Sequence, residues 1–193
     1  MARLNWSVYQ RPKLGETCCG DAYLIKEVNN GAIVVLVDGL GHGEEAAYAS
    51  RQAVQIIQQF EVWPDASCIQ FLHNQLRSTR GVVLGLTILD FLENRLTYWG
   101  VGNIQAQVQS QTTTNLISAA GVIGFRLPKL IQQNHPFRLG DRLIMLTDGI
   151  LNNWQDTKLD SYSFSPSQIS TGIGEKYATP DDDATVLVIR RIN

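Results

Sequence analysis

The chain has 193 residues, 44% hydrophobic and 18% charged, with a formal net charge of −2, which predicts one globular domain, 1–193. It has no basic run for nucleic acid or an anionic membrane, and no apolar stretch near the ~20 residues that span a bilayer. The N-terminus lacks a signal-peptide layout and three cysteines make no disulfide framework, so we expect a cytoplasmic protein, as a monomer.

The first predicted strands bring two aspartates together. Residues 4–10 alternate apolar and polar, as a half-buried strand does, and a second strand is expected over 22–28. A tight turn at Asn30 then leads to a run of five apolar residues that ends at Asp38. With the turn there, Asp21 and Asp38 lie at the same end of an antiparallel hairpin.

A glycine-rich loop, Asp38 to Gly43, follows this run and opens a predicted helix that extends to residue 60. Glycine accepts positive φ and lets backbone groups approach a ligand closely. The spacing is neither G-x-G-x-x-G nor that of a P-loop, and a leading acid repels phosphate unless a divalent ion lies between them. Locally, a ligand-binding turn and a plain solvated turn are both compatible with the sequence.

The middle of the chain predicts one more helix and then a meander. A helix is expected from an N-cap at Asp65 through Arg77, with His73 packed on its inner face and not a metal ligand. Strand-turn-strand spacing beyond it favours an antiparallel sheet over βαβ crossovers. The strands are expected over 82–91, 96–101, 104–109 and 115–119.

The C-terminal part repeats the pattern of an apolar strand that ends at an acid. Residues 142–147 form such a strand, and Asp148 follows it; Asp141, in the turn before, is expected in solvent. A helix is expected over 165–177, with a Ser-Pro start, before the last strand, 186–190. The segment between Asp148 and that strand leaves little room for a large lid, so we expect an open, shallow site.

Aspartates thus stand at four strand ends: Asp21, Asp38, Asp148 and Asp182-Asp183. If these ends converge, the carboxylates cannot all ionise without a compensating charge. Hard divalent cations are the natural partners of an all-oxygen site, and no His/Cys set suits zinc. Two ions bridged by a carboxylate would activate water and hold a phosphoryl group. A calcium-binding β-domain is disfavoured because the aspartates are dispersed along the chain.

An ordered set of motifs resembles the metal-dependent protein Ser/Thr phosphatases, the PPM family, over roughly residues 15–190. The closer similarity is to the bacterial sporulation and stress-response branch, in the short single-domain form that acts as a stressosome feedback phosphatase. The motifs are Cys19-Gly20-Asp21, Asp38 to Gly43, Gly85-x-Thr87, Gly102-Asn103, Gly140-Asp141 with Thr147-Asp148-Gly149, and Asp182-Asp183-Ala184-Thr185.

The resemblance implies an α+β fold, a four-layer αββα sandwich of two antiparallel sheets flanked by helices. It also implies two divalent metal ions, Mn²⁺ or Mg²⁺, at one edge. Asp38 would bridge the ions, Asp21 would bind one or hold a metal-bound water, and Asp183 is the alternative to Asp182. The implied metal-binding positions are Asp38, Gly39, Asp148, Asp182 and Asp21.

The implied activity is hydrolysis of phosphoserine or phosphothreonine on STAS-domain stressosome proteins, by direct attack of water and without a phosphoenzyme. Asp38 and Asp21 are the aspartates that the resemblance implies as catalytic residues. Two alternatives stay open: a phosphatase for an anti-sigma-factor antagonist outside any stressosome, and a catalytically silent phosphoprotein-binding module of the same fold. The presence of every family aspartate argues against the silent module.

Some positions depart from the family pattern. Leu40 stands where eukaryotic members have a histidine, and neither Arg3 nor Arg11 matches their phosphate-binding arginine. His42 is our candidate for donating a proton to the leaving oxygen, with a surface histidine as the alternative. No C-x5-R motif follows the Cys18-Cys19 pair, so we interpret these cysteines as structural.

Overall fold

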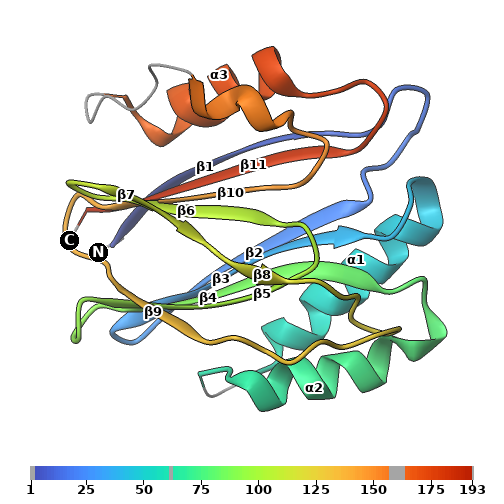
Figure 1. The fold of residues 1–193 in the computed structure, drawn as a ribbon, viewed down its shortest axis with the longest axis horizontal. Coiled ribbons are helices and arrows are strands. Elements are labelled where there is room, and N and C mark those ends of the chain that lie inside the picture. The colour runs from blue at the N-terminus through green and yellow to red at the C-terminus, as the bar shows by residue number, and fades with distance from the viewer. Residues whose placement is uncertain (1–2, 61–62, 157–163, 193) are drawn as a thin grey trace.

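The structure, a computed structural model, describes residues 3–60, 63–156 and 164–192. Two β-sheets face each other and helices cover both outer faces (Figure 1), which confirms the expected four-layer α+β sandwich. The elements are β1 (Leu4–Arg11), β2 (Asp21–Val28), β3 (Gly31–Gly39), α1 (Gly43–Gln58), α2 (Ala66–Gln75), η1 (Leu76–Ser78), β4 (Val82–Asp90), β5 (Arg95–Val101), β6 (Gln105–Gln109), β7 (Thr113–Leu116), β8 (Ser118–Ala119), β9 (Gln133–Pro136), β10 (Arg142–Leu146), η2 (Asn152–Asp156), α3 (Pro166–Tyr177) and β11 (Ala184–Arg191).

One sheet has the strand order β1-β11-β10-β6-β7, with antiparallel neighbours throughout. The other has the order β2-β3-β4-β5, and β5 then pairs with both β8 and β9. The β5–β8 pair is parallel, whereas the other pairs of this sheet are antiparallel. The expected antiparallel architecture therefore holds apart from this short pair.

Three apolar layers hold the sandwich together, and β3 contributes to two of them. Ala32, Val34 and Leu36 pack between the sheets, whereas the alternate residues Ile33 and Val35 pack against the layer of α1 and α2. A third cluster joins the first sheet to α3. Because successive side chains of a strand point to opposite faces, an unbroken apolar run is what a strand buried on both faces requires.

The helix starts follow the local sequence signals. Asp65 caps α2, its carboxylate accepting a hydrogen bond from the backbone N–H of Ser67 at 2.8 Å. Ser165 caps α3 in a reciprocal capping box. His73 is buried and its Nδ1 accepts a hydrogen bond from the backbone N–H of Gly124 at 3.0 Å, which confirms it as a packed residue. None of the helices in the described ranges is both long and apolar enough to cross a membrane.

One strand prediction and one burial prediction were wrong, and one strand was missed. The strand expected over 115–119 breaks at Ile117 into β7, which pairs with β6, and β8, which joins the opposite sheet. The strand over 133–136 was missed because it is short and polar and ends in a proline. Asp141 is buried, because its carboxylate accepts a hydrogen bond from the backbone N–H of Arg138 at 2.7 Å.

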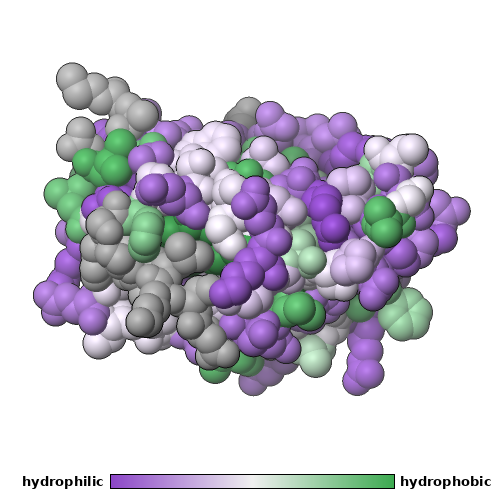
Figure 2. Space-filling model, turned by 90° about the horizontal axis from the view of Figure 1, so that it is seen from above, coloured by the Kyte–Doolittle hydropathy of each residue, from purple (hydrophilic) through white to green (hydrophobic). Residues whose placement is uncertain are grey.

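The outer face over α3 is visible in Figure 2, which looks down on that layer. On the part of this face that is not drawn in grey, apolar side chains in green lie among polar side chains in purple. This is the surface expected of an amphipathic helix whose apolar side chains pack against the sheet beneath it.

Arg191, at the end of β11, links the two sheets at the end of the sandwich away from Asp38. Its guanidinium donates hydrogen bonds to the backbone carbonyls of Phe91 at 2.9 Å and Phe137 at 2.6 Å, and to Asn94 Oδ1 at 2.9 Å. The side chain is 6% exposed. A single buried cation therefore satisfies acceptors from two separate segments, the β4–β5 turn and the residue after β9.

Replacing this cation should destabilise the fold at a distance from the cavity. We expect Arg191→Ala to lower the free energy of unfolding by about 2–4 kcal/mol, because buried carbonyls lose their donor. Urea unfolding measures the change, and Arg190→Ala, at a partly exposed neighbouring position, should cost well under half as much. Equal losses in the two variants would contradict this role for Arg191.

Candidate active site

One end of the sandwich gathers the strand ends that carry aspartates. Asp21 and Asp38 are direct register partners in the β2–β3 hairpin, as the turn at Asn30 predicted. Asp148 follows β10 and Asp182 lies just before β11, and these two strands are neighbours in the opposite sheet. Each sheet thus supplies part of one acidic group.

A cavity of about 220 Å³ lies at this end. The predicted residues Asp38, His42, Asp148 and Asp182 share its walls. The full lining is Lys13, Asp38, Leu40, Gly41, His42, Val83, Asn103, Asp148, Asp181 and Asp182. The sequence predicts little room for a large lid between Asp148 and the last strand. Residues 157–163 of this segment lie outside the described residues.

Asp21 is held just behind this cavity by two hydroxyl groups. It is 5% exposed, and its Oδ2 accepts hydrogen bonds from Thr147 Oγ1 at 2.8 Å and Thr185 Oγ1 at 2.7 Å. Its Oδ1 is buried and has no hydrogen-bond partner among the described residues. The two threonines belong to the sequence motifs, but sequence reasoning assigned them no role.

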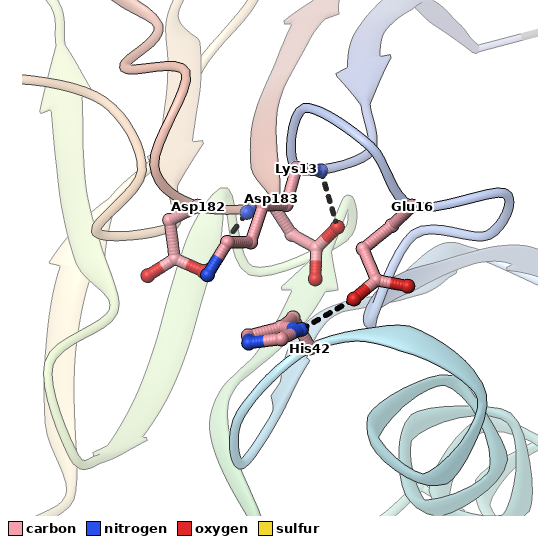
Figure 3. A network of polar contacts seen from close by, with 5 residues as sticks. All are labelled: Lys13, Glu16, His42, Asp182 and Asp183. Atoms are coloured by element: carbon pink, nitrogen blue, oxygen red, sulfur yellow. Dashed lines mark hydrogen bonds and ion pairs between the residues drawn. The ribbon is translucent and has the colours of Figure 1, made fainter.

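The structure separates the two candidate acids before β11. Asp182 lines the cavity, and its Oδ1 accepts a hydrogen bond from the backbone N–H of Asp183 at 2.9 Å. Asp183 is 3% exposed and is not part of the cavity lining; its Oδ1 accepts a hydrogen bond from the backbone N–H of Lys13 at 2.9 Å (Figure 3). Its Oδ2 is buried and unpartnered within the described ranges. On geometry, Asp182 is the acid that faces the cavity.

Two further contacts shape the cavity: one is made by Asn103, which had no role assigned from the sequence, and the other by Gly39, an implied metal-binding position. The side-chain amide of Asn103 donates a hydrogen bond to Asp148 Oδ2 at 2.6 Å, which fixes that carboxylate. At Gly39, an added Cβ would lie 2.1 Å from the carbonyl oxygen of Ala46, so glycine lets α1 pack against the strand end. Only the motif Gly102-Asn103 hinted at the first of these contacts.

Burial, and then repulsion between neighbouring carboxylates, raise the pKa of several aspartates at this end of the sandwich. Burial raises the pKa of Asp38 to about 9, with further contributions from Asp21, Asp148 and other acids nearby. Burial also raises the pKa of Asp21 to about 7, partly offset by the hydrogen bonds from Thr185 and Thr147. The pKa of Asp148 is raised by burial and then by Asp182. A cation in the cavity would relieve this repulsion.

The donor set fits a hard divalent cation. Carboxylate and backbone oxygens are the ligands that Mg²⁺ and Mn²⁺ prefer, and the unpartnered Oδ1 of Asp21 is a spare acceptor. Within the described part of the chain, no group of three or more His, Cys, Asp or Glu side chains could hold an ion as it stands. Mg²⁺ commonly uses one or two carboxylates and completes its shell with water and phosphate.

His42 lies at the cavity, whereas Cys19 is held as a protonated thiol. His42 lines the cavity and its Nδ1 lies 2.6 Å from Glu16 Oε1, a partner that no sequence signal indicated. Cys19 Sγ donates a hydrogen bond to the carbonyl of Arg11 at 3.6 Å, and burial raises the pKa of this thiol. A protonated thiol is a poor nucleophile, which agrees with the structural interpretation.

Comparison with known proteins gives one consistent relationship. The family described as Stage II sporulation protein E (SpoIIE) matches residues 29–192. Phosphoserine phosphatase RsbX of Bacillus subtilis (strain 168) is 24% identical over 145 residues, which cover 74% of this chain and 73% of RsbX.

Two solved structures share the fold over nearly the whole chain. One is a chain from work on the bacterial stressosome as a modular system adapted to control secondary messenger signaling. It is 30% identical with a TM-score of 0.90, and the match covers 98% of this chain and all of the other. The second is RsbX in complex with magnesium, 22% identical with a TM-score of 0.84, covering 97% of this chain and 95% of the other.

The raised pKa of Asp38 makes a prediction for the metal-free protein. An aspartate has an ordinary pKa of 3.8, so between that value and about 9 the folded protein retains a proton that the unfolded chain has lost. Stability should therefore fall as the pH rises through this window. Asp38→Asn should raise the free energy of unfolding in EDTA by about 1–2 kcal/mol at pH 8 and flatten this dependence.

Urea unfolding of both proteins at pH 5, 7 and 9 measures the effect. Asp65→Asn is the matched control, because that aspartate is a remote helix cap and asparagine caps equally well. Parallel pH dependences for wild type and Asp38→Asn would show that the pKa of Asp38 is not raised in the folded protein.

Proposed function

The chain belongs to the SpoIIE family of PPM serine/threonine phosphatases, and from this premise we propose that it dephosphorylates phosphoserine or phosphothreonine on STAS-domain stressosome proteins, resetting a stress-signalling pathway. The carrying observation is that acids from both sheets, Asp38, Asp148 and Asp182, line a single cavity. The similarity to RsbX and to the stressosome-derived chain supports this choice of substrate. We further propose that residues 1–193 act as one cytoplasmic, monomeric domain.

We propose that two divalent cations, Mn²⁺ or Mg²⁺, are the cofactors. The residues that would hold them are Asp38, Gly39, Asp148, Asp182 and Asp21. Asp38 would supply a carboxylate ligand, and Oδ1 of Asp21 could be a further one, since it has no hydrogen-bond partner among the described residues. Bound there, the cations would supply positive charge that polarises the phosphoryl group and activates the attacking water. The magnesium in the RsbX crystal structure supports this choice of ion.

The protein's own groups then have defined tasks. Asn103 keeps Asp148 directed at the cavity, and Thr147 and Thr185 keep Asp21 from turning away. We propose His42 as the residue that donates a proton to the seryl or threonyl oxygen as it leaves. Attack by water on phosphorus needs no covalent enzyme intermediate.

The surroundings of the cavity favour a protein substrate. Leu40 on the cavity wall is 37% exposed, and Leu14, next to the lining residue Lys13, is 78% exposed. Exposed leucines beside a small polar cavity suit contact with a folded surface that presents one phosphorylated side chain. A free small phosphate ester would make no use of them.

The chemistry can be tested with p-nitrophenyl phosphate. We expect turnover with Mn²⁺ or Mg²⁺, none with EDTA, and a loss of about 100-fold or more in Asp38→Asn, because the acid shared by both ion positions is gone. Asp65→Asn should keep wild-type activity. Calorimetric metal binding without turnover in the wild type would instead support the silent binding module.

The substrate assignment needs a phosphorylated STAS-domain protein. We expect metal-dependent release of phosphate from it with a kcat/KM at least about 10-fold above that for a free peptide carrying the same phosphoresidue, because the exposed leucines add contacts. Activity on the peptide equal to that on the folded protein would contradict this preference. Faster turnover of a phosphorylated anti-sigma-factor antagonist would redirect the assignment to that partner.

A further inference from the structure

We infer that Glu16 is a positioning residue, which holds the imidazole of His42 so that it can pass a proton to the leaving oxygen. This inference rests on the proposed phosphatase function and extends it to a residue outside every motif identified in the sequence. It is argued from the contact itself, the anchoring of its loop, and the glycine beside it.

The contact between the two side chains is short and directional. His42 Nδ1 and Glu16 Oε1 are 2.6 Å apart, which is characteristic of a charge-assisted hydrogen bond. Figure 3 shows Glu16 on one side of the imidazole, with the second ring nitrogen on the opposite side. When Nδ1–H donates a hydrogen bond to Glu16, Nε2 is the nitrogen that is left for chemistry. In the protonated ring, the proton on Nε2 is the one that a leaving oxygen can take.

Glu16 is carried by a loop that is tied to the acidic end of the other sheet. The backbone N–H of Lys13 donates to Asp183 Oδ1 at 2.9 Å, and that of Leu14 donates to the carbonyl of Pro180 at 3.0 Å. The backbone N–H of Glu16 itself donates to the carbonyl of Lys13 at 3.0 Å. The segment that holds the histidine is therefore fixed relative to the segment that bears the acid Asp182.

Gly43 provides the space that the carboxylate needs. Its φ of +74° lies in the left-handed region, and an added Cβ would lie 2.9 Å from Glu16 Oε2. Any side chain at this position would both strain the start of α1 and displace Glu16. The glycine after His42 thus serves the contact between Glu16 and His42 as well as the turn.

Fold stability gives a weak reason for this pair. The side chains of His42 and Glu16 are 46% and 30% exposed, and exposed ion pairs typically contribute only about 0.2–1 kcal/mol. The location of the pair at the cavity points to chemistry instead. The other ionisable side chains that line this cavity are Lys13, Asp38, Asp148, Asp181 and Asp182.

The proton transfer balances as follows. Water oxygen bonds to phosphorus, the bond from phosphorus to the seryl oxygen breaks, and its electron pair stays on that oxygen. The seryl oxygen takes the proton from Nε2 of the protonated ring, while Nδ1–H stays hydrogen-bonded to Glu16. The ring regains a proton from solvent, which receives the one lost by the attacking water. The products are the free hydroxyl and inorganic phosphate.

Two aryl phosphates with different leaving groups can distinguish proton donation by His42 from the attack of water on phosphorus. p-Nitrophenolate leaves without help, whereas phenolate is far more basic and benefits from a proton donor, which is commonly worth about 10²–10⁴-fold. We expect Glu16→Ala and His42→Ala to lower kcat/KM for phenyl phosphate by at least about 10-fold and for p-nitrophenyl phosphate by less than about 3-fold. Glu16→Gln should retain part of the activity, since its amide oxygen still accepts from Nδ1.

A second readout does not depend on turnover. Nitrogen-15 NMR of the imidazole in the magnesium-free protein should show the Nδ1–H tautomer of His42 in the wild type and a shift toward Nε2–H in Glu16→Ala. Glu44→Ala is the matched control, because it removes an acid two residues from His42 that pairs with Arg51. It should change neither the tautomer nor the leaving-group dependence.

The outcomes are distinguishable. A wild type without metal-dependent turnover of either ester would overturn the proposed function, and the role of Glu16 with it. A wild type active on both esters, with variants that lose both equally or neither, would overturn only the inference about Glu16. An unchanged His42 tautomer in Glu16→Ala would also overturn it.

Discussion

Repulsion between carboxylates in a confined, poorly hydrated space is the constraint on which this structure depends. Burial of Asp38, and then the charges of Asp21, Asp148 and other nearby acids, raise its pKa and favour its neutral form in the absence of a cation. Such an arrangement costs stability, so the fold must compensate elsewhere. It does so with hydroxyl donors for Asp21, an amide donor for Asp148 and backbone donors for the acids before β11.

The sandwich divides labour between its two ends. At the end with the cavity, the loops are rich in glycine and acidic residues, and hydrogen bonds between side chains hold the acids in place. At the opposite end, Arg191 joins segments of both sheets, and between the ends lie continuous apolar layers. Stability is concentrated away from the charged rim, where the chemistry demands a costly grouping of like charges.

Sequence reasoning predicted the parts of this picture that local rules control. The turn at Asn30 determined the pairing of Asp21 with Asp38, and the caps of α2 and α3 followed from single polar residues. Contacts between distant segments escaped it. The break at Ile117 depends on which sheet accepts each half of the segment, and the contact between Glu16 and His42 depends on how a loop folds back. Neither leaves a periodic or compositional signal.

The position of β11 has a consequence for how the protein is made. This strand inserts between β1 and β10, and it brings with it Asp182, Asp183 and Thr185, after every other element of the sandwich has been translated. A nascent chain whose β11 segment is still inside the ribosome holds Asp21, Asp38 and Asp148 but lacks Asp182, which also lines the cavity. Assembly of the acidic cavity is therefore coupled to completion of the first sheet.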